Sequence, residues 1–99
     1  MTIKEFIGTC NHGMASTNWP ESWHPLQRAL ALDSIGQWDA AHSIAQDDPS
    51  PLGSAVHAYL HRKEGVQWNA EYWYRRAGRS PHPGTLEEEW KELAAELLD

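Results

Sequence analysis

Two histidines and a glutamate stand at metal-ligand spacing in the second half of the chain. His57 and His61 are four residues apart, and Glu64 follows three residues later. Residues three and four apart share a helix face, so these side chains would lie together. Imidazole and carboxylate groups suit Zn²⁺ or Fe²⁺, with water in the remaining positions. The pattern predicts a metal-binding protein or a metal-dependent enzyme as one alternative, with imidazoles in an exposed polar stripe or stacked on tryptophans as the other.

A second group of residues combines an aromatic ring with two positive charges. Tyr72, Arg76 and Arg79 recur at i, i+4 and i+7 on one predicted helix face. Such a face could bind an acidic or phosphorylated ligand, or its arginines could dock on carbonyls, tryptophan rings or the acidic end of the chain. The predicted partner-binding set, bordering a shallow groove between the first helices of two hairpins, is His57, His61, Arg62, Tyr72, Arg76 and Arg79.

The single cysteine, Cys10, lies two residues from His12. A lone cysteine cannot form a disulfide within the chain, and a cytoplasmic location is expected in the absence of a secretory segment. A Cys–His nucleophile would need an orienting acid and an oxyanion site, neither of which the sequence identifies. A buried thiol is the favoured interpretation.

Composition and charge narrow the classes further. The chain has 99 residues, 40% of them hydrophobic, with six tryptophans and a net charge of −6. This is one ordinary globular domain, and its acidity argues against general nucleic-acid binding. No apolar run is long enough to suggest a membrane span. Most tryptophans are expected in the core, with Trp19 and Trp23 as the candidates for an exposed binding edge.

Breakers and apolar stripes divide the chain into helices. Hydrophobic periodicity predicts helices over about 23–35, 37–47, 51–64, 66–78 and 85–98, after a short N-terminal helix and a loop over 9–20. Pro25 and Pro51 suit first helical turns, Gly36 and Gly65 suit helix ends, and Thr85 begins a capping box. The fold prediction is all-α, with an N-terminal segment (1–20), two stacked antiparallel hairpins (21–48 and 49–79) and a C-terminal capping helix (85–98).

A weak internal repeat supports the two hairpins. A shift of 29 residues superimposes Pro20 on Pro49, Gly36 on Gly65 and Ala41 on Ala70. The second hairpin contains Glu64-Gly65-Val66 and then Ala70-Glu71-Tyr72-Trp73-Tyr74-Arg75-Arg76-Ala77, and the first contains Gly36-Gln37-Trp38-Asp39-Ala40-Ala41. These segments resemble the tetratricopeptide superfamily, and more narrowly its Sel-one-like branch.

The resemblance implies stacked hairpins that bind proteins or peptides on a concave face. We therefore expect a non-catalytic interaction module without a cofactor, whose partner is a protein, a peptide or a second copy of the chain as a homodimer. The metal-binding face of His57, His61 and Glu64 is the alternative.

Overall fold

The computed structural model describes residues 1–12, 19–20 and 22–98, and within this part it is all-helical. The helices are α1 (Ile3–His12), α2 (Pro25–Ser34), α3 (Trp38–Asp47), α4 (Pro51–Glu64), α5 (Gln67–Ala77) and α6 (Leu86–Leu97). None of these helices has both the length and the apolarity needed to cross a membrane. The predicted all-α fold class is confirmed.

Local chemistry determines where the central helices begin and end. The Ser50 side chain accepts a hydrogen bond from the Gly53 N–H, and Pro51 occupies the first turn of α4. Gly65 ends α4 with φ of 92°, in the left-handed region that favours glycine. At α6, Thr85 and Glu88 form the predicted capping box. These termini were readable from sequence because each depends on residues within one helical turn.

The turn between α3 and α4 is tight. A Cβ atom on Gly53 would lie 2.5 Å from the carbonyl oxygen of Asp48. No side chain fits there without moving the backbone, so the glycine allows α4 to start close against the end of α3.

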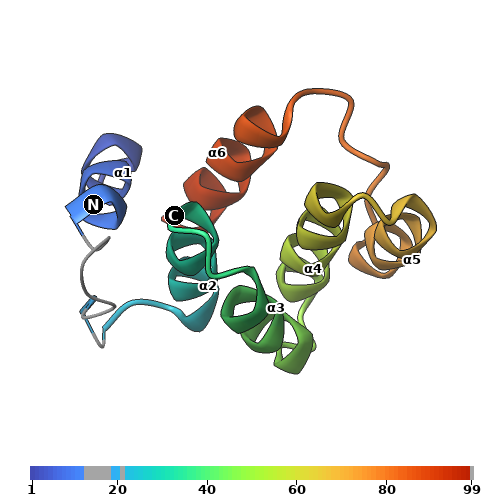
Figure 1. The fold of residues 1–99 in the computed structure, drawn as a ribbon, viewed down its shortest axis with the longest axis horizontal. Helices are drawn as coiled ribbons and strands as arrows, with labels where there is room; N and C mark the ends of the chain where they lie inside the picture. Colours follow the sequence, from blue (N-terminus) through green and yellow to red (C-terminus); the bar gives the residue numbers. More distant parts are fainter. Residues whose placement is uncertain (13–18, 21, 99) are drawn as a thin grey trace.

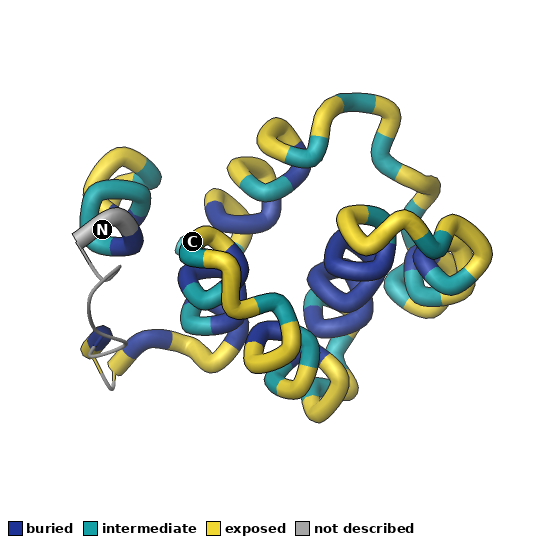
Figure 2. Tube along the Cα trace, in the orientation of Figure 1, coloured by how far each residue is buried: buried dark blue, intermediate teal, exposed yellow. Residues whose placement is uncertain are grey.

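The helices are arranged as two hairpins crossed by α6 (Figure 1). Helix α2 packs on α3, α4 packs on α5, and α3 packs on α4, which places the second hairpin against the first. Helix α6 contacts α2, α4 and α1. Helix α4 lies at the centre, and Figure 2 shows that most of its length is buried.

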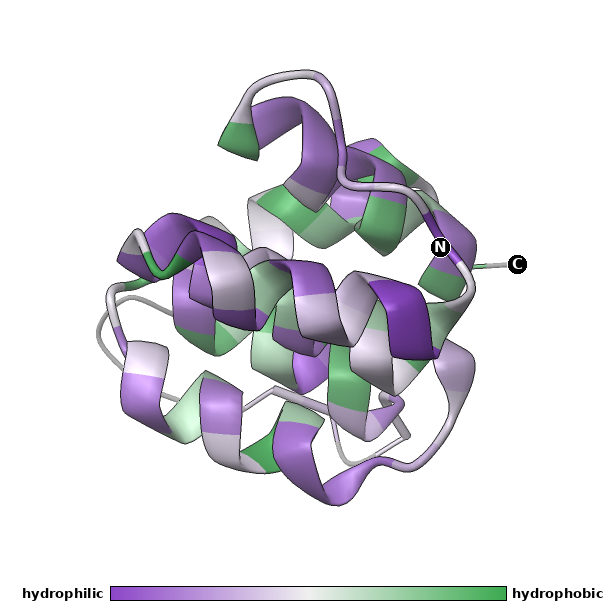
Figure 3. Cartoon of the chain, turned by 90° about the vertical axis from the view of Figure 1, so that its right-hand side faces the viewer, coloured by the Kyte–Doolittle hydropathy of each residue, from purple (hydrophilic) through white to green (hydrophobic). Residues whose placement is uncertain are grey.

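Aromatic and aliphatic side chains form the core, and the helices carry hydrophilic residues as well (Figure 3). Phe6 lies 4.9 Å from Trp23 and 5.7 Å from Trp90 between ring centroids, which ties α1 to the rest of the molecule. A second cluster at the crossing of α4 and α5 contains Ala58, Ala70 and Tyr74. The small alanines allow the two helices to approach closely.

Two tryptophan assignments from the sequence are wrong. Trp19 and Trp23, expected at an exposed edge, are buried and stacked on each other, and the Trp19 indole donates to the Thr9 carbonyl. Trp23 is covered because Phe6 of α1 packs on it. The tryptophan that is exposed is Trp68, at 72%.

The N-terminal helix is longer than expected. The sequence predicts a short helix followed by a loop from residue 9, whereas α1 continues to His12. Thr9 and Cys10 therefore lie on the helix, and the Thr9 hydroxyl donates to the Glu5 carbonyl one turn earlier. The remainder of the predicted loop, at 13–18, lies outside the described residues.

Two buried carboxylates form hydrogen bonds that connect α4 to the helices around it. Glu89 of α6 accepts from Arg62 Nη1 at 2.9 Å and from the Tyr74 hydroxyl at 2.5 Å. Asp33 of α2 accepts from the Tyr59 hydroxyl at 2.7 Å and from Lys63 Nζ at 2.9 Å. Glu89 thus joins α6 to α4 and α5, and Asp33 joins α2 to α4.

Replacing Glu89 by glutamine should lower the free energy of unfolding by about 2–3 kcal/mol, because Arg62 loses its buried counter-charge. Urea denaturation measures this change. Glu87→Gln is the matched control on the same helix, because its ion pair with Lys91 is exposed and worth at most about 0.5 kcal/mol. Equal losses in both variants would contradict the role given to Glu89.

Candidate metal centre

Three histidines meet between α3 and α4. Nε2 of His57 lies 2.9 Å from Nε2 of His42, and the rings of His57 and His61 are 4.7 Å apart between centroids. One ring nitrogen from each of His42, His57 and His61 lies within 4.8 Å of the other two. His57 and His61 are buried, whereas His42 is half-buried. The cluster therefore has a protected side on α4 and a more accessible side on α3.

Tryptophan rings hold the imidazoles in place. The His42 ring stacks on Trp38 at 4.9 Å, and the His57 ring stacks on Trp73 at 3.9 Å. Trp38 is itself fixed, because its indole N–H donates to the Leu60 carbonyl at 2.9 Å. The sequence alternative of imidazoles stacked on tryptophans is what the structure contains, and the alternative of an exposed polar stripe is wrong.

Glu64 has a different place from the one predicted. Its carboxylate lies 3.1 Å from Nδ1 of His61 and is 41% exposed. It is not among the three clustered groups, so the predicted set of His57, His61 and Glu64 becomes His42, His57 and His61. A carboxylate bonded to the far nitrogen of a histidine is the arrangement that orients metal-ligating imidazoles in many proteins.

His42 was missed because it lies on another helix. A signal was nevertheless present: His42 stands seven residues before Pro49, and His57 stands seven residues after Ser50. In an antiparallel helix pair, residues equally far from the connecting turn lie opposite each other. Once the turn at 48–50 is recognised, this symmetry places the two histidines side by side.

The surroundings lower the pKa of two of these histidines, His42 and His57. Burial lowers the pKa of His57 to about 3, and the neighbouring His42 and His61 add to the effect. Burial also lowers the pKa of His42, again with a contribution from His61. Nδ1 of His57 has no hydrogen-bond partner among the described residues. Neutral imidazoles offer free lone pairs, which is the protonation state that binds metals.

The arrangement can supply three nitrogen ligands to one ion. Histidine nitrogens lie about 2.0–2.1 Å from zinc, so small ring movements from the present separations would complete a three-nitrogen site. Such a site leaves one tetrahedral position for water. The Glu64 carboxylate is already bonded to His61, so the described site provides no separate general base.

The predicted partner-binding residues are dispersed. His57 and His61 lie in the cluster, Arg62 pairs with Glu89 and with the Gly84 carbonyl, and Arg79 pairs with Glu96. The predicted groove between the first helices of the hairpins, α2 and α4, is covered by α6: the Trp90 indole donates to the Leu30 carbonyl, and Gln27 donates to the Leu97 carbonyl. The two arginines therefore have the structural role that the sequence left as an alternative.

Tyr72 and Arg76 remain on the surface. The Arg76 guanidinium lies 5.9 Å from the centre of the Tyr72 ring and 5.3 Å from that of Trp73. With the exposed Trp68, these residues form a patch on α5. Of the predicted partner-binding set, Tyr72 and Arg76 are exposed, whereas Arg62 and Arg79 are half-buried.

Cys10 is 1% exposed, and burial raises the pKa of its thiol to about 11. The thiolate is the reactive form, so this cysteine is a poor nucleophile in the folded protein. The predicted buried thiol is confirmed, whereas the His12 side chain lies outside the described residues.

In the presence of a chelator, the protein should lose stability in acid partly through His57. Its pKa rises from about 3 in the folded chain to 6.5 in the unfolded chain, so unfolding takes up a proton between these values. The contribution of His57 to the free energy of unfolding is fully present above pH 6.5, and it is lost as the pH falls from 6.5 toward 3. Between pH 7 and pH 5, wild type should lose about 2 kcal/mol more than His57→Phe, as measured by urea denaturation. Parallel losses in the two proteins would contradict this assignment.

Comparison with known proteins gives no relative. No family model, curated protein or solved structure matches the chain. The resemblance to the tetratricopeptide superfamily therefore stays a prediction, and the function has to be inferred from the geometry of the sites.

Proposed function

We propose that this protein binds a divalent transition metal, with Zn²⁺ as the best-fitting ion, through His42, His57 and His61. The observation that carries the proposal is the convergence of one ring nitrogen from each histidine within 4.8 Å. Burial lowers the pKa of His42 and of His57, and a tryptophan ring stacks on each of them. The Glu64 carboxylate lies 3.1 Å from Nδ1 of His61. Imidazole nitrogen suits zinc, and these properties are those of a ligand set rather than of an ordinary hydrophobic contact.

The bound metal would stabilise the packing of the two hairpins. His42 belongs to the first hairpin, whereas His57 and His61 belong to the second. An ion held by all three would link the hairpins at the surface where α3 packs on α4. The site would therefore stabilise the fold or sense metal.

Chelator-treated protein should bind Co²⁺ with visible absorption bands and with quenching of Trp38 and Trp73 fluorescence, because both indoles lie on ligand rings. Zn²⁺ should displace Co²⁺ and raise the melting temperature. At a free metal concentration 100-fold above the dissociation constant, the stabilisation should be about 2.7 kcal/mol.

Ligand variants separate this site from adventitious binding. His57→Phe and His42→Gln should each weaken metal binding about 10- to 100-fold or more, as for removal of a supporting group or a ligand. His82→Gln is the control, because His82 lies beside Glu92 away from the cluster. Metal binding only at millimolar concentrations, or equal weakening by His82→Gln, would refute the proposal.

Protein binding through α5 is a second candidate. Trp68 is 72% exposed and Tyr72 is 42% exposed, while Arg76 lies over Tyr72. Exposed tryptophan, tyrosine and arginine are the side chains that contribute most at protein interfaces. With this patch, the protein would still be an interaction module. Its contact surface would be the outer face of α5 and not the groove between α2 and α4, which α6 covers.

Trp68→Gln and Arg76→Glu should each weaken capture of a co-purifying protein, or of a second copy of the chain, without lowering the melting temperature. Both side chains are exposed, so their replacement should change stability by no more than about 0.5 kcal/mol. Pull-down and sedimentation experiments measure the binding. Unchanged capture, or a matching loss of stability, would count against this candidate.

A further inference from the structure

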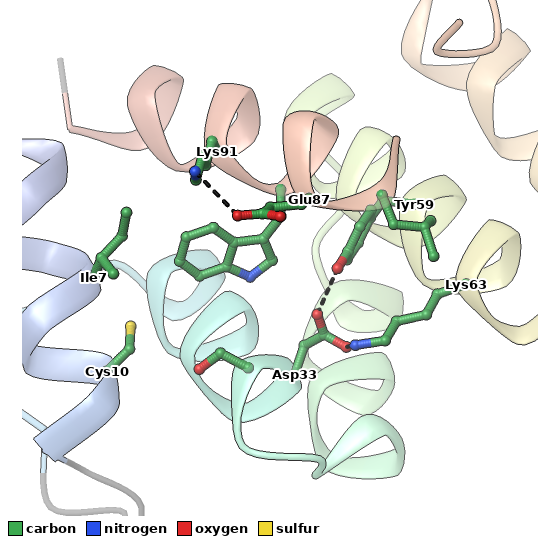
Figure 4. A pocket seen from close by; sticks show the side chains of 10 residues that line it. Ile7, Cys10, Asp33, Tyr59, Lys63, Glu87 and Lys91 are labelled. Atoms are coloured by element: carbon green, nitrogen blue, oxygen red, sulfur yellow. Dashed lines mark hydrogen bonds and ion pairs between the residues drawn. The ribbon is translucent and has the colours of Figure 1, made fainter. Parts of the chain in front are cut away.

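A cavity of about 320 Å³ opens where four helices meet, on a different part of the molecule from the histidines. Figure 4 shows Ile7 and Cys10 projecting toward it from α1, with Asp33, Tyr59 and Lys63 across from them. This volume lies in the range of pockets that hold small organic molecules. The cavity lining and the histidine cluster share no residue.

One side of the cavity is apolar and fixed. Trp90 lines it, and its indole N–H is used by the Leu30 carbonyl at 3.0 Å, so the ring offers mainly its apolar surface. Ile7, Leu86 and the protonated Cys10 thiol complete this side. A planar aromatic or compact aliphatic body would fit against these groups.

The other side carries a positioned ammonium group. Lys63 Nζ lies 2.9 Å from Asp33 Oδ1, and the Asp33 carboxylate is 2% exposed and also bonded to the Tyr59 hydroxyl. An ammonium has three donors, and Lys63 uses one of them within the described part of the chain. Lys91, which pairs with the exposed Glu87 at 3.1 Å, brings a second ammonium to the rim.

From the placement of these groups, we infer that the cavity binds a small amphipathic carboxylate, with its apolar body against Trp90 and its anionic group on Lys63. Spare donors on Lys63 and Lys91 would bond the carboxylate oxygens, whereas both oxygens of Asp33 already have donors. A cationic ligand would have to compete with Lys63 for Asp33, or with Lys91 for Glu87. Asp33 acts as a positioning residue, because its Oδ1 accepts a hydrogen bond from Lys63 Nζ and so holds the ammonium in place.

Naphthalene-2-carboxylate is a suitable probe, with 2-naphthylmethylamine as the matched cation. With EDTA present, so that the metal site does not contribute, calorimetry should show a dissociation constant below about 1 mM for the acid, which corresponds to about 4 kcal/mol. The amine should bind at least ten-fold more weakly. Amide shifts in nuclear magnetic resonance spectra should centre on Ile7, Ser34 and Leu86.

Protein variants test the role of the ion pair. Lys63→Met alone leaves a buried carboxylate unpaired, so it is combined with Asp33→Asn, which removes both charges and keeps an acceptor for Tyr59. This double variant should weaken binding of the acid at least ten-fold, while Lys4→Met, an exposed lysine of α1, should not. The inference is overturned if the acid fails to bind, if the amine binds as tightly, if the shifts lie elsewhere, or if the folded double variant retains full affinity.

Discussion

The burial of α4 on every side between Gly53 and His61 is the constraint on which the rest of the structure depends. One face carries His57 and His61 toward α3, and another carries Tyr59 and Lys63 toward Asp33 of α2. Arg62 reaches Glu89 of α6. Polar side chains on this buried stretch have no solvent to bond to, so His57 and Tyr59 bond to partners on neighbouring helices. Those partners fix the positions of α2, α3 and α6 together.

Both candidate sites are consequences of this arrangement. A buried polar group that meets a complementary charge forms an ion pair that holds two helices together, as Arg62 and Glu89 do. Burial lowers the pKa of His42 and of His57, whose rings meet Nε2 to Nε2, and Nδ1 of His57 has no hydrogen-bond partner among the described residues. Lys63 is intermediate, because its charge is balanced by Asp33 while donors are left over. Within seven residues, from His57 to Lys63, the same central helix thus contributes an arginine of a buried ion pair, two imidazoles of the histidine cluster and an ammonium group.

The features that depend on neighbouring residues were predictable from the sequence. Ser50, Pro51, Gly65 and Thr85 act within one helical turn, so helix boundaries around α4 and α6 were predictable. The position of α6 was not, because the connection from Gly78 to Thr85 does not specify which face the helix will cover. The groove expected between α2 and α4 was therefore assigned to a partner. His42 was missed for a different reason: the turn at 48–50 places it opposite His57, but the predicted ligands all lay within one helix.

The close approach of Gly53 to Asp48 has an effect well beyond the turn itself. Successive residues of a helix are rotated by about 100°, so a backbone adjustment that wound α4 by one position would carry His57 away from His42 and toward a different neighbour. The absence of a single methyl group at residue 53 therefore sets the rotational phase of the central helix. The orientation of the His57 and His61 rings, four and eight residues further along α4, therefore depends on residue 53 having no Cβ atom.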